Sequence, residues 1–294
     1  CLGDATVGAE NDGSIICPAS GNGSVDVKTT IGIVPQQYII PVSVSQDTAG
    51  PMTKSVMGSA LMMNAMATTT PGIDFTAMLS KEALVRARIG VLIFAKGQSP
   101  RVQALFTQAL SDLESSGAVL ADINKRPVPP EYYAQMTYAI LKHEFKEGLN
   151  AYLSSSASEQ VPSRNLAQLI AFNQNHSARE LALFDQSIFI GSEAMEPLES
   201  NQYRAAIAVV QQTTQNNGID KLLQQYNVDV LVAPSGVLAP RIDPINGDVW
   251  PNDWPGYGSH AAQAGYPHVT VPMGGFKHLT VGLSFMGGKI RMQK

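Results

Sequence analysis

Two apolar runs on either side of an amphipathic segment constrain the fold of this chain more than any other feature. The runs ARIGVLIF at 87–94 and GAVLADI at 117–123 have the length and composition of buried strands. Between them, residues 99–116 carry apolar residues at helical spacing, with Ser99 placed to cap a helix and Pro100 suited to its first turn. A strand, a helix and a strand in this order form the unit from which parallel sheets are built. The sequence therefore predicts an α/β fold.

Further strands are expected toward both ends of the chain. The β-rich runs are 25–34, 228–235, 267–273 and 279–288, the last two separated by a Gly-Gly turn. Residues 129–227 have mainly helical patterns. Because strands occur on both sides of this stretch, we expect one α/β domain over 1–294, a mixed β-sheet flanked by helices, with a mainly helical insertion around 129–227.

Composition excludes several classes of protein. Hydrophobic residues make up 44% of the 294 residues and charged residues 15%, which favours a packed core over disorder. The net charge is −4, and Lys and Arg do not form runs interleaved with aromatic residues, so we expect no nucleic-acid partner. Apolar stretches are far shorter than the roughly 20 residues that a membrane-spanning helix needs. We therefore expect no membrane partner.

Cysteines and histidines give no sign of a cofactor. Cys1 and Cys17 are too few for a disulfide framework and lack metal-ligand spacing, and the histidines are scattered. We expect no metal and no cofactor, and a buried Cys17 in its apolar context. The chain lacks an initiating Met, so we expect that it begins within a larger reading frame. The compartment stays open, with the cytoplasm favoured over the periplasm.

The stretch GAENDGSIICPAS at 8–20 raises the question of function. Ser14 lies among glycines, and a glycine-rich turn lets backbone N–H groups approach a bound group and attract negative charge. An oxyanion hole needs such a turn, but Gly-Ser turns are also common without any catalytic role, and this stretch lacks the G-x-S-x-G pattern. From the residues alone, Ser14 is a candidate nucleophile or an ordinary turn residue.

Three blocks in order resemble the amidase signature family. GAENDGSIICPAS, VKTTIGIVP at 27–35 and SQDTAGPMTKSV at 45–56 match its patterns G-T-[DE]-x-[GD]-G-S-I-x-x-P-A, K-P-T-x-G-x-V and [SQ]-D-[ST]-x-G-P-M. The segment at 164–189 is similar to the peptide-amidase-like branch of that family. The resemblance covers nearly the whole chain. It implies the amidase-signature α/β fold, incomplete at the N-terminus, and a hydrolase of amides.

The resemblance also implies roles for individual residues. Ser14 matches the nucleophile, and the backbone N–H groups of Asn11, Asp12 and Gly13 match the oxyanion hole. Asp47 matches an aspartate that supports the site from behind. Lys28 matches a structural lysine rather than the base.

The family's base is a lysine that acts through a bridging serine, and both precede the nucleophile. No stretch of this chain matches them: Ser115-Ser116-Gly117 is the nearest imitation, and we interpret it as a helix end. Other departures are Ala9, where the family has threonine, and Ile16, where it often has arginine. The chain therefore resembles a C-terminal portion of an amidase without the complete Ser-Ser-Lys triad.

Two alternatives for the missing base are present in the chain. Lys54 follows Asp47 closely and is interpreted as an exposed helical lysine. His260 and His268 lie in one segment and would allow a Ser-His hydrolase. The nearby loop NDWPGYG, with Trp254 and Tyr257, is a candidate lining of the acyl pocket.

The resemblance therefore implies hydrolysis of a carboxamide C–N bond through Ser14 and an acyl-enzyme. We expect this chain to be inactive alone. Its substrate would be a small-molecule or peptide amide. Its partners could be a second copy of the chain or the missing N-terminal segment. The alternative is a non-catalytic relative that binds amide-like ligands or a partner protein.

Overall fold

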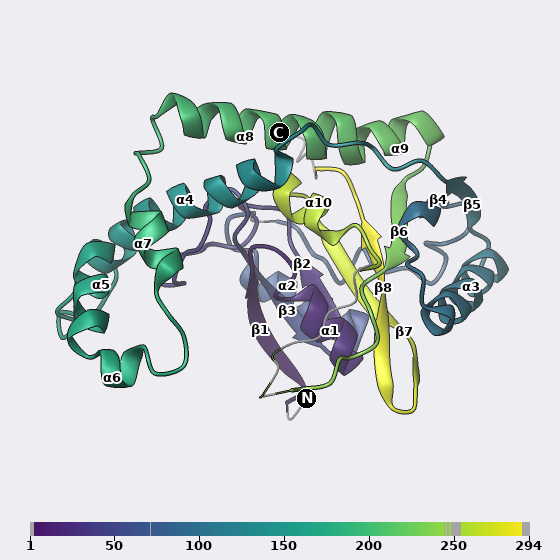
Figure 1. Cartoon of the computed structure of the whole chain (residues 1–294). Coiled ribbons are helices and arrows are strands. Elements are labelled where there is room, and N and C mark those ends of the chain that lie inside the picture. The colour runs from purple at the N-terminus through teal and green to yellow at the C-terminus, as the bar shows by residue number, and fades with distance from the viewer. Residues whose placement is uncertain (1–2, 71, 244, 246, 248–253, 290–294) are drawn as a thin grey trace. The chain divides into compact units, whose positions relative to one another are not determined.

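The computed structural model describes residues 3–70, 72–243, 245, 247 and 254–289. Its contacts divide the chain into two compact units (Figure 1). The first unit comprises residues 1–35, 48–128 and 214–294, and the second comprises 36–47 and 129–213. No helix in the described ranges has both the length and the apolar character needed to cross a membrane.

The first unit is built on a mixed sheet of eight strands in the order β1-β3-β2-β7-β8-β6-β4-β5. The strands are β1 Ala5–Glu10, β2 Val25–Lys28, β3 Thr48–Thr53, β4 Arg88–Leu92, β5 Val119–Ile123, β6 Val230–Pro234, β7 His268–Phe276 and β8 Leu279–Met286. Strand β4 pairs in parallel with β5 and β6, whereas every other adjacent pair is antiparallel. The α/β fold with a mixed sheet, expected from the sequence, is confirmed.

Helices that alternate with the strands along the chain pack in the first unit. They are α1 Ile16–Asn22, α2 Val56–Met66, η1 Ile93–Ala95, α3 Pro100–Ser115, the π-helical turn η2 Gln215–Ile219, α9 Asp220–Tyr226 and α10 Gly258–Ala264. The predicted unit β4-α3-β5 is present, with Pro100 in the first turn of α3 and Gly117 (φ 95°) just beyond its end. Ser99 precedes α3 as expected, but its side chain makes no capping hydrogen bond. Ser116 lies at the C-terminal end of α3, as the sequence indicated.

Two features of the sheet differ from the sequence prediction. The strand expected over 25–34 ends at Lys28, and Gly32 beyond it has a φ of 86°, which a strand does not adopt. Strand β3 was not predicted, and Gly50 and Pro51 inside it are residues that strands generally disfavour. Glycine is required there, since a Cβ on Gly50 would lie 1.8 Å from the carbonyl oxygen of Val27. The short strand β1 was also missed.

The turn between β7 and β8 is displaced from its expected position. Gly274 and Gly275 are part of β7, next to an irregularity in its register between Pro272 and Gly274. The chain reverses instead at Lys277 and His278, which have φ values of 48° and 69°. Two successive positive φ values are typical of the tight hairpin turns whose twist matches that of the strands.

The two faces of strand β4 bury separate clusters. Ile89 and Val91 pack with Phe106 of α3, and Leu92 packs with the cluster that includes Leu222 of α9 and residues of α10. This division follows from the alternation of side chains along a strand. The sheet therefore has helices on both of its faces around β4, as a doubly covered parallel segment requires.

The second unit is helical. It contains α4 Tyr133–Ser155, α5 Leu166–Asn175, α6 Ser177–Glu180, α7 Ser187–Glu193 and most of α8 Asn201–Thr214. The loop 36–47 belongs to it, because the buried carboxylate of Glu144 accepts hydrogen bonds from the Ser43 hydroxyl and from the Ser45 N–H at 3.0 Å. Helix α9, at the end of the helical stretch expected over 129–227, belongs to the first unit.

Candidate active site

Ser14 lies in the first unit, on a tight turn between β1 and α1. It is exposed, and helix α1 begins two residues later. Gly13 has a φ of 92°, and its carbonyl oxygen accepts a hydrogen bond from the N–H of Cys17 at 2.8 Å. Glycine is needed at this position because its φ is strained for any side chain, and a Cβ would lie 3.0 Å from Cys17 Sγ.

Glu10 holds the ends of this turn together. One oxygen of its buried carboxylate accepts hydrogen bonds from the N–H groups of Ile15 at 2.7 Å and Ile16 at 3.0 Å. These N–H groups open helix α1, where a negative charge is favourable. Glu10, the last residue of β1, therefore holds the ends of the turn formed by residues 11–14. Glu10 was not among the residues predicted from the sequence.

Only some of the backbone N–H groups of the turn donate hydrogen bonds within the described part of the chain. The Asp12 N–H donates to Asn11 Oδ1 at 2.8 Å, whereas the N–H groups of Gly13 and Ser14 have no acceptor in the described part of the chain. Such N–H groups at a turn are suited to bind an oxygen that carries negative charge. Their convergence near the Ser14 hydroxyl stays a prediction.

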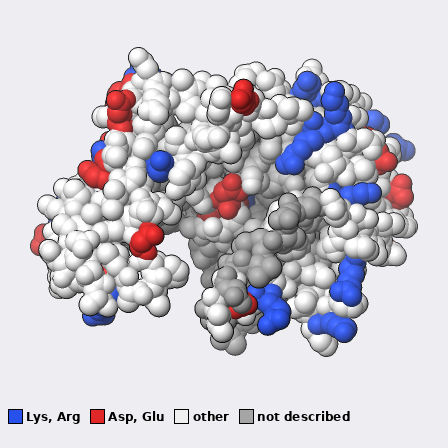
Figure 2. Space-filling model, in the orientation of Figure 1, with Lys and Arg blue, Asp and Glu red and all other residues white. Residues whose placement is uncertain are grey.

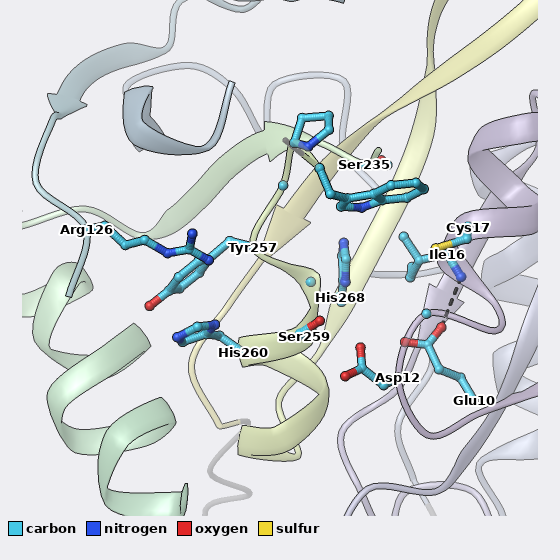
Figure 3. A pocket seen from close by; sticks show the side chains of 15 residues that line it. Glu10, Asp12, Ile16, Cys17, Arg126, Ser235, Tyr257, Ser259, His260 and His268 are labelled. Atoms are coloured by element: carbon cyan, nitrogen blue, oxygen red, sulfur yellow. Dashed lines mark hydrogen bonds between the residues drawn. The ribbon is translucent and has the colours of Figure 1, made fainter. Parts of the chain in front are cut away.

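A cavity of about 460 Å³ adjoins the turn (Figure 3). It is lined by Glu10, Asp12, Gly13, Ile16, Cys17, Arg126, Ser235, Trp254, Pro255, Gly256, Tyr257, Gly258, Ser259, His260 and His268. Ser14 is not among these lining residues, but its neighbours on both sides are. Trp254 and Tyr257 line the cavity as the sequence indicated, while Asn252 and Asp253 of the same loop lie outside the described residues.

The two histidines of the cavity do not contact Ser14. His268 is buried, and its Nε2 is hydrogen-bonded to Ser284 Oγ at 2.6 Å. His260 stacks on the ring of Tyr257, with centroids 3.9 Å apart. Burial lowers the pKa of His260 to about 4 and that of His268 to about 3, so both are neutral near pH 7. No hydrogen bond joins either ring to the Ser14 hydroxyl, and the geometry does not form a Ser-His pair.

Lys28 is the last residue of β2 and is fully buried. Its Nζ donates to the carbonyl oxygens of Tyr266 at 2.8 Å and Ala261 at 3.3 Å, which ties β2 to the segment between α10 and β7. Burial lowers the pKa of Lys28 to about 8, and the charges of Glu10 and Asp12 partly oppose this. These contacts are those expected of a structural lysine.

Lys54 and Asp47 make other contacts. Lys54 lies between β3 and α2 rather than on a helix, and its Nζ pairs with Asp4 at 2.8 Å on the exposed surface. Asp47 lies in the second unit, where its Oδ2 accepts hydrogen bonds from the N–H groups of Val42 and Ser43, both at 2.8 Å. Its support of the turn at 11–13 stays a prediction.

Cys17 is exposed rather than buried, contrary to the expectation from its apolar neighbours. It is the second residue of α1 and lines the cavity, so the helix turns it away from the core that Ile16 enters. Desolvation of the thiol, followed by the charges of Glu10 and Asp12, raises its pKa to about 11.

Arg126 and Ser235 line the cavity but were not predicted from the sequence. Arg126 follows β5 and Ser235 follows β6, at the carboxyl ends of strands in the parallel part of the sheet. Ligand sites of α/β sheets gather at that edge, so a polar residue just after each predicted parallel strand was the available signal.

A serine on a tight turn before a short helix, beside a cavity at the edge of a mixed sheet, is an arrangement suited to hydrolases that use a serine nucleophile. The sequence comparison gives the family directly. Residues 2–292 match the family described as Amidase, and the chain belongs to this family.

Individual relatives agree with this assignment. The solved structure of native peptide amidase from Stenotrophomonas maltophilia is 38% identical, with a TM-score of 0.83 over 98% of this chain and 59% of that one. An amidase family protein from Bacillus anthracis is 27% identical, with a TM-score of 0.78 over 97% of this chain and 53% of that one. A probable amidase of Arabidopsis thaliana is 26% identical over 92% of this chain and 50% of its own length. The chain spans about half the length of the curated relatives that it matches.

Proposed function

We propose that this chain carries the nucleophile and oxyanion hole of an enzyme that hydrolyses carboxamides. The observation that carries the proposal is the position of Ser14, exposed on a glycine turn whose Gly13 and Ser14 N–H groups have no acceptor in the described residues, beside a cavity large enough for a small acyl group. Membership of the Amidase family supports the same reaction. The substrate is a linear amide, either a small molecule or a peptide amide.

In the proposed reaction, Ser14 Oγ attacks the carbonyl carbon of the amide and gives its proton to a base. The N–H groups of Asn11, Gly13 and Ser14 stabilise the negative oxygen of the tetrahedral intermediate, and the Asp12 N–H joins them only if it leaves Asn11 Oδ1. The C–N bond then breaks, and the leaving nitrogen takes a proton to depart as ammonia or an amine. Water hydrolyses the ester at Ser14 and releases the carboxylic acid.

Among the described residues, no lysine or histidine is hydrogen-bonded to Ser14 Oγ. Lys28 donates to two backbone carbonyls, Lys54 pairs with Asp4, and His268 is hydrogen-bonded to Ser284. The resemblance implies a lysine that acts through a second serine. We propose that a segment outside these 294 residues supplies both, and that the chain by itself has negligible activity.

Labelling with a serine-directed fluorophosphonate tests the nucleophile. The experiment uses the chain together with a segment that provides the lysine and the glycine-serine loop. We expect labelling at Ser14, and loss of both labelling and amide turnover in Ser14→Ala. Ser115→Ala, an exposed serine at the end of α3 that does not line the cavity, is the matched control and should keep the labelling. Labelling at another residue with turnover intact in Ser14→Ala would reject Ser14 as the nucleophile.

The same preparation tests the origin of the base. We expect no measurable turnover from the chain alone and turnover after the segment is added, because oxyanion stabilisation without a base gives only a small residual rate. Turnover by the isolated chain on the order of ten per second would show that it carries its own base.

A further inference from the structure

The cavity beside Ser14 has opposite charge at its two ends. Glu10 and Asp12 line it next to the turn, and Arg126 lines it from the opposite side, after β5 (Figure 3). Desolvation raises the pKa of Asp12, with hydrogen bonds from Ser259 and Gln263 acting in the other direction. A ligand in this cavity therefore meets carboxyl groups at the Ser14 end and a guanidinium at the far end.

Arg126 is positioned by an aromatic wall. Its Cζ lies 5.9 Å from the ring centroid of Phe94 and 5.8 Å from that of Tyr257, and these two rings meet edge to face at 5.4 Å. Tyr257 in turn stacks on His260. Contacts between a cation and aromatic faces hold a guanidinium in place without neutralising its charge. Arg126 is exposed, and no carboxylate in the described part of the chain forms an ion pair with it.

Within the described lining of the cavity, Arg126 carries the positive charge at neutral pH. His260 and His268 are neutral because burial lowers the pKa of His260 to about 4 and of His268 to about 3, and the charge of Arg126 adds to the effect on His260. Figure 2 shows Lys and Arg side chains gathered over the part of this face where β5 and α9 lie, which is the side from which Arg126 reaches the cavity. An anionic group is therefore attracted to this end and repelled from the end with Glu10 and Asp12.

We propose that the cavity binds the acyl portion of the substrate and that Arg126 selects acyl groups that carry a carboxylate at the end away from the scissile amide. This inference rests on the function proposed above and names the substrate class of the same site. A guanidinium binds a carboxylate through two parallel N–H donors, which also fixes the direction of the acyl chain. The substrates are then monoamides of dicarboxylic acids, or peptide amides with a carboxylate in the corresponding position.

Binding can be measured without turnover in the Ser14→Ala chain. The probes are glutaramate, which has a primary amide at one end and a carboxylate at the other, and its neutral isostere 5-methylhexanamide. We expect glutaramate to bind about tenfold more tightly in an NMR titration, and the preference to shrink as salt is raised to 0.5 M. Equal affinity of the two probes would overturn the proposal.

Variants of Arg126 identify the residue responsible. Arg126→Gln should remove the preference for glutaramate, and Arg126→Lys should keep part of it because the charge remains but the paired donors are lost. Arg101→Gln is the matched control, since Arg101 also lies over an aromatic ring, 3.9 Å from the centroid of Phe276, but does not line the cavity. A preference that survives in Arg126→Gln would reject Arg126 as its source. These outcomes do not depend on hydrolysis, so failure of the nucleophile assignment and failure of the binding preference are separate results.

Discussion

The carboxylate of Glu10 accepts a hydrogen bond from the backbone N–H of Ile15 at 2.7 Å, and the turn that carries Ser14 lies between these two residues. A strand end and a helix start are thereby joined through a single buried acid. The turn is held from both sides without using the N–H groups of Gly13 and Ser14, which remain available for a ligand.

Replacement of Glu10 should destabilise the fold and the site together. We expect Glu10→Ala to lower the free energy of unfolding by about 2 kcal/mol, because the buried N–H groups of Ile15 and Ile16 lose their acceptor. Glu10→Gln should cost less than half of this, since an amide oxygen can still accept. Urea unfolding measures both, with the exposed Glu82→Ala expected to stay within about 0.5 kcal/mol. Equal stability of Glu10→Ala and the parent chain would contradict the role of Glu10.

Gly13 and Gly32 form a matched pair for the turn. Both have positive φ, 92° and 86°, but a Cβ on Gly13 would lie 3.0 Å from Cys17 Sγ, whereas nothing lies within 4 Å of one on Gly32. Each substitution by alanine should cost about 1 kcal/mol of stability from backbone strain. In the chain combined with the segment that provides the lysine, fluorophosphonate labelling of Ser14 should fall more than tenfold in Gly13→Ala. It should not fall in Gly32→Ala. Normal labelling in Gly13→Ala would show that reaction at Ser14 does not require the backbone conformation of Gly13.

Asp26 should make the stability depend on pH. It is fully buried in β2, and burial raises its pKa from 3.8 to about 6, against the smaller opposing effect of hydrogen bonds from the Ser24 side chain and the Thr53 backbone. The folded state therefore binds the proton more tightly than the unfolded state, so stability from this group is present below about pH 4 and is lost as pH rises through 6. The rise in pKa corresponds to about 3 kcal/mol.

The difference between Asp26→Asn and the parent chain isolates this effect, because other titrating groups cancel. We expect the variant to gain about 2.4 kcal/mol relative to the parent between pH 4 and pH 7.5, measured by urea unfolding at each pH. Asp112→Asn, on the exposed face of α3, is the control and should show no such trend. A difference that stays constant with pH would show that Asp26 does not titrate in this range.

Cys17 should react slowly although it is exposed. Its pKa of about 11 leaves the thiol protonated at pH 7.5, so its thiolate fraction is roughly a hundredfold lower than that of an ordinary cysteine. In a Cys1→Ser background, alkylation by iodoacetamide at pH 7.5 should be at least thirtyfold slower than in urea-unfolded chain. The rate should rise about tenfold for each pH unit up to pH 9.5. Rapid alkylation of the folded chain would refute the raised pKa.

Local patterns in the sequence were sufficient to predict individual secondary-structure elements and the family of the protein. The strand-helix-strand unit follows from apolar periodicity, and α3 starts at Pro100 and stops before Gly117 because those residues restrict or free the backbone. The blocks around Ser14, Lys28 and Asp47 determined the family. Strand β3 could not be predicted from local patterns, because Gly50 and Pro51 by themselves disfavour a strand. Gly50 is required only because β2 approaches it closely.

Only the tertiary structure decided which residues meet at the site. Glu10, Arg126, Ser235 and His268 come from four separate segments, and the sheet order places the ends of their strands at one cavity. Burial likewise shifts the pKa values of buried groups, downward for His260 and His268 and upward for Asp26, because a buried ionised group gives up its hydration. Hydration and strand order depend on the whole fold, and therefore no local pattern of residues contains them.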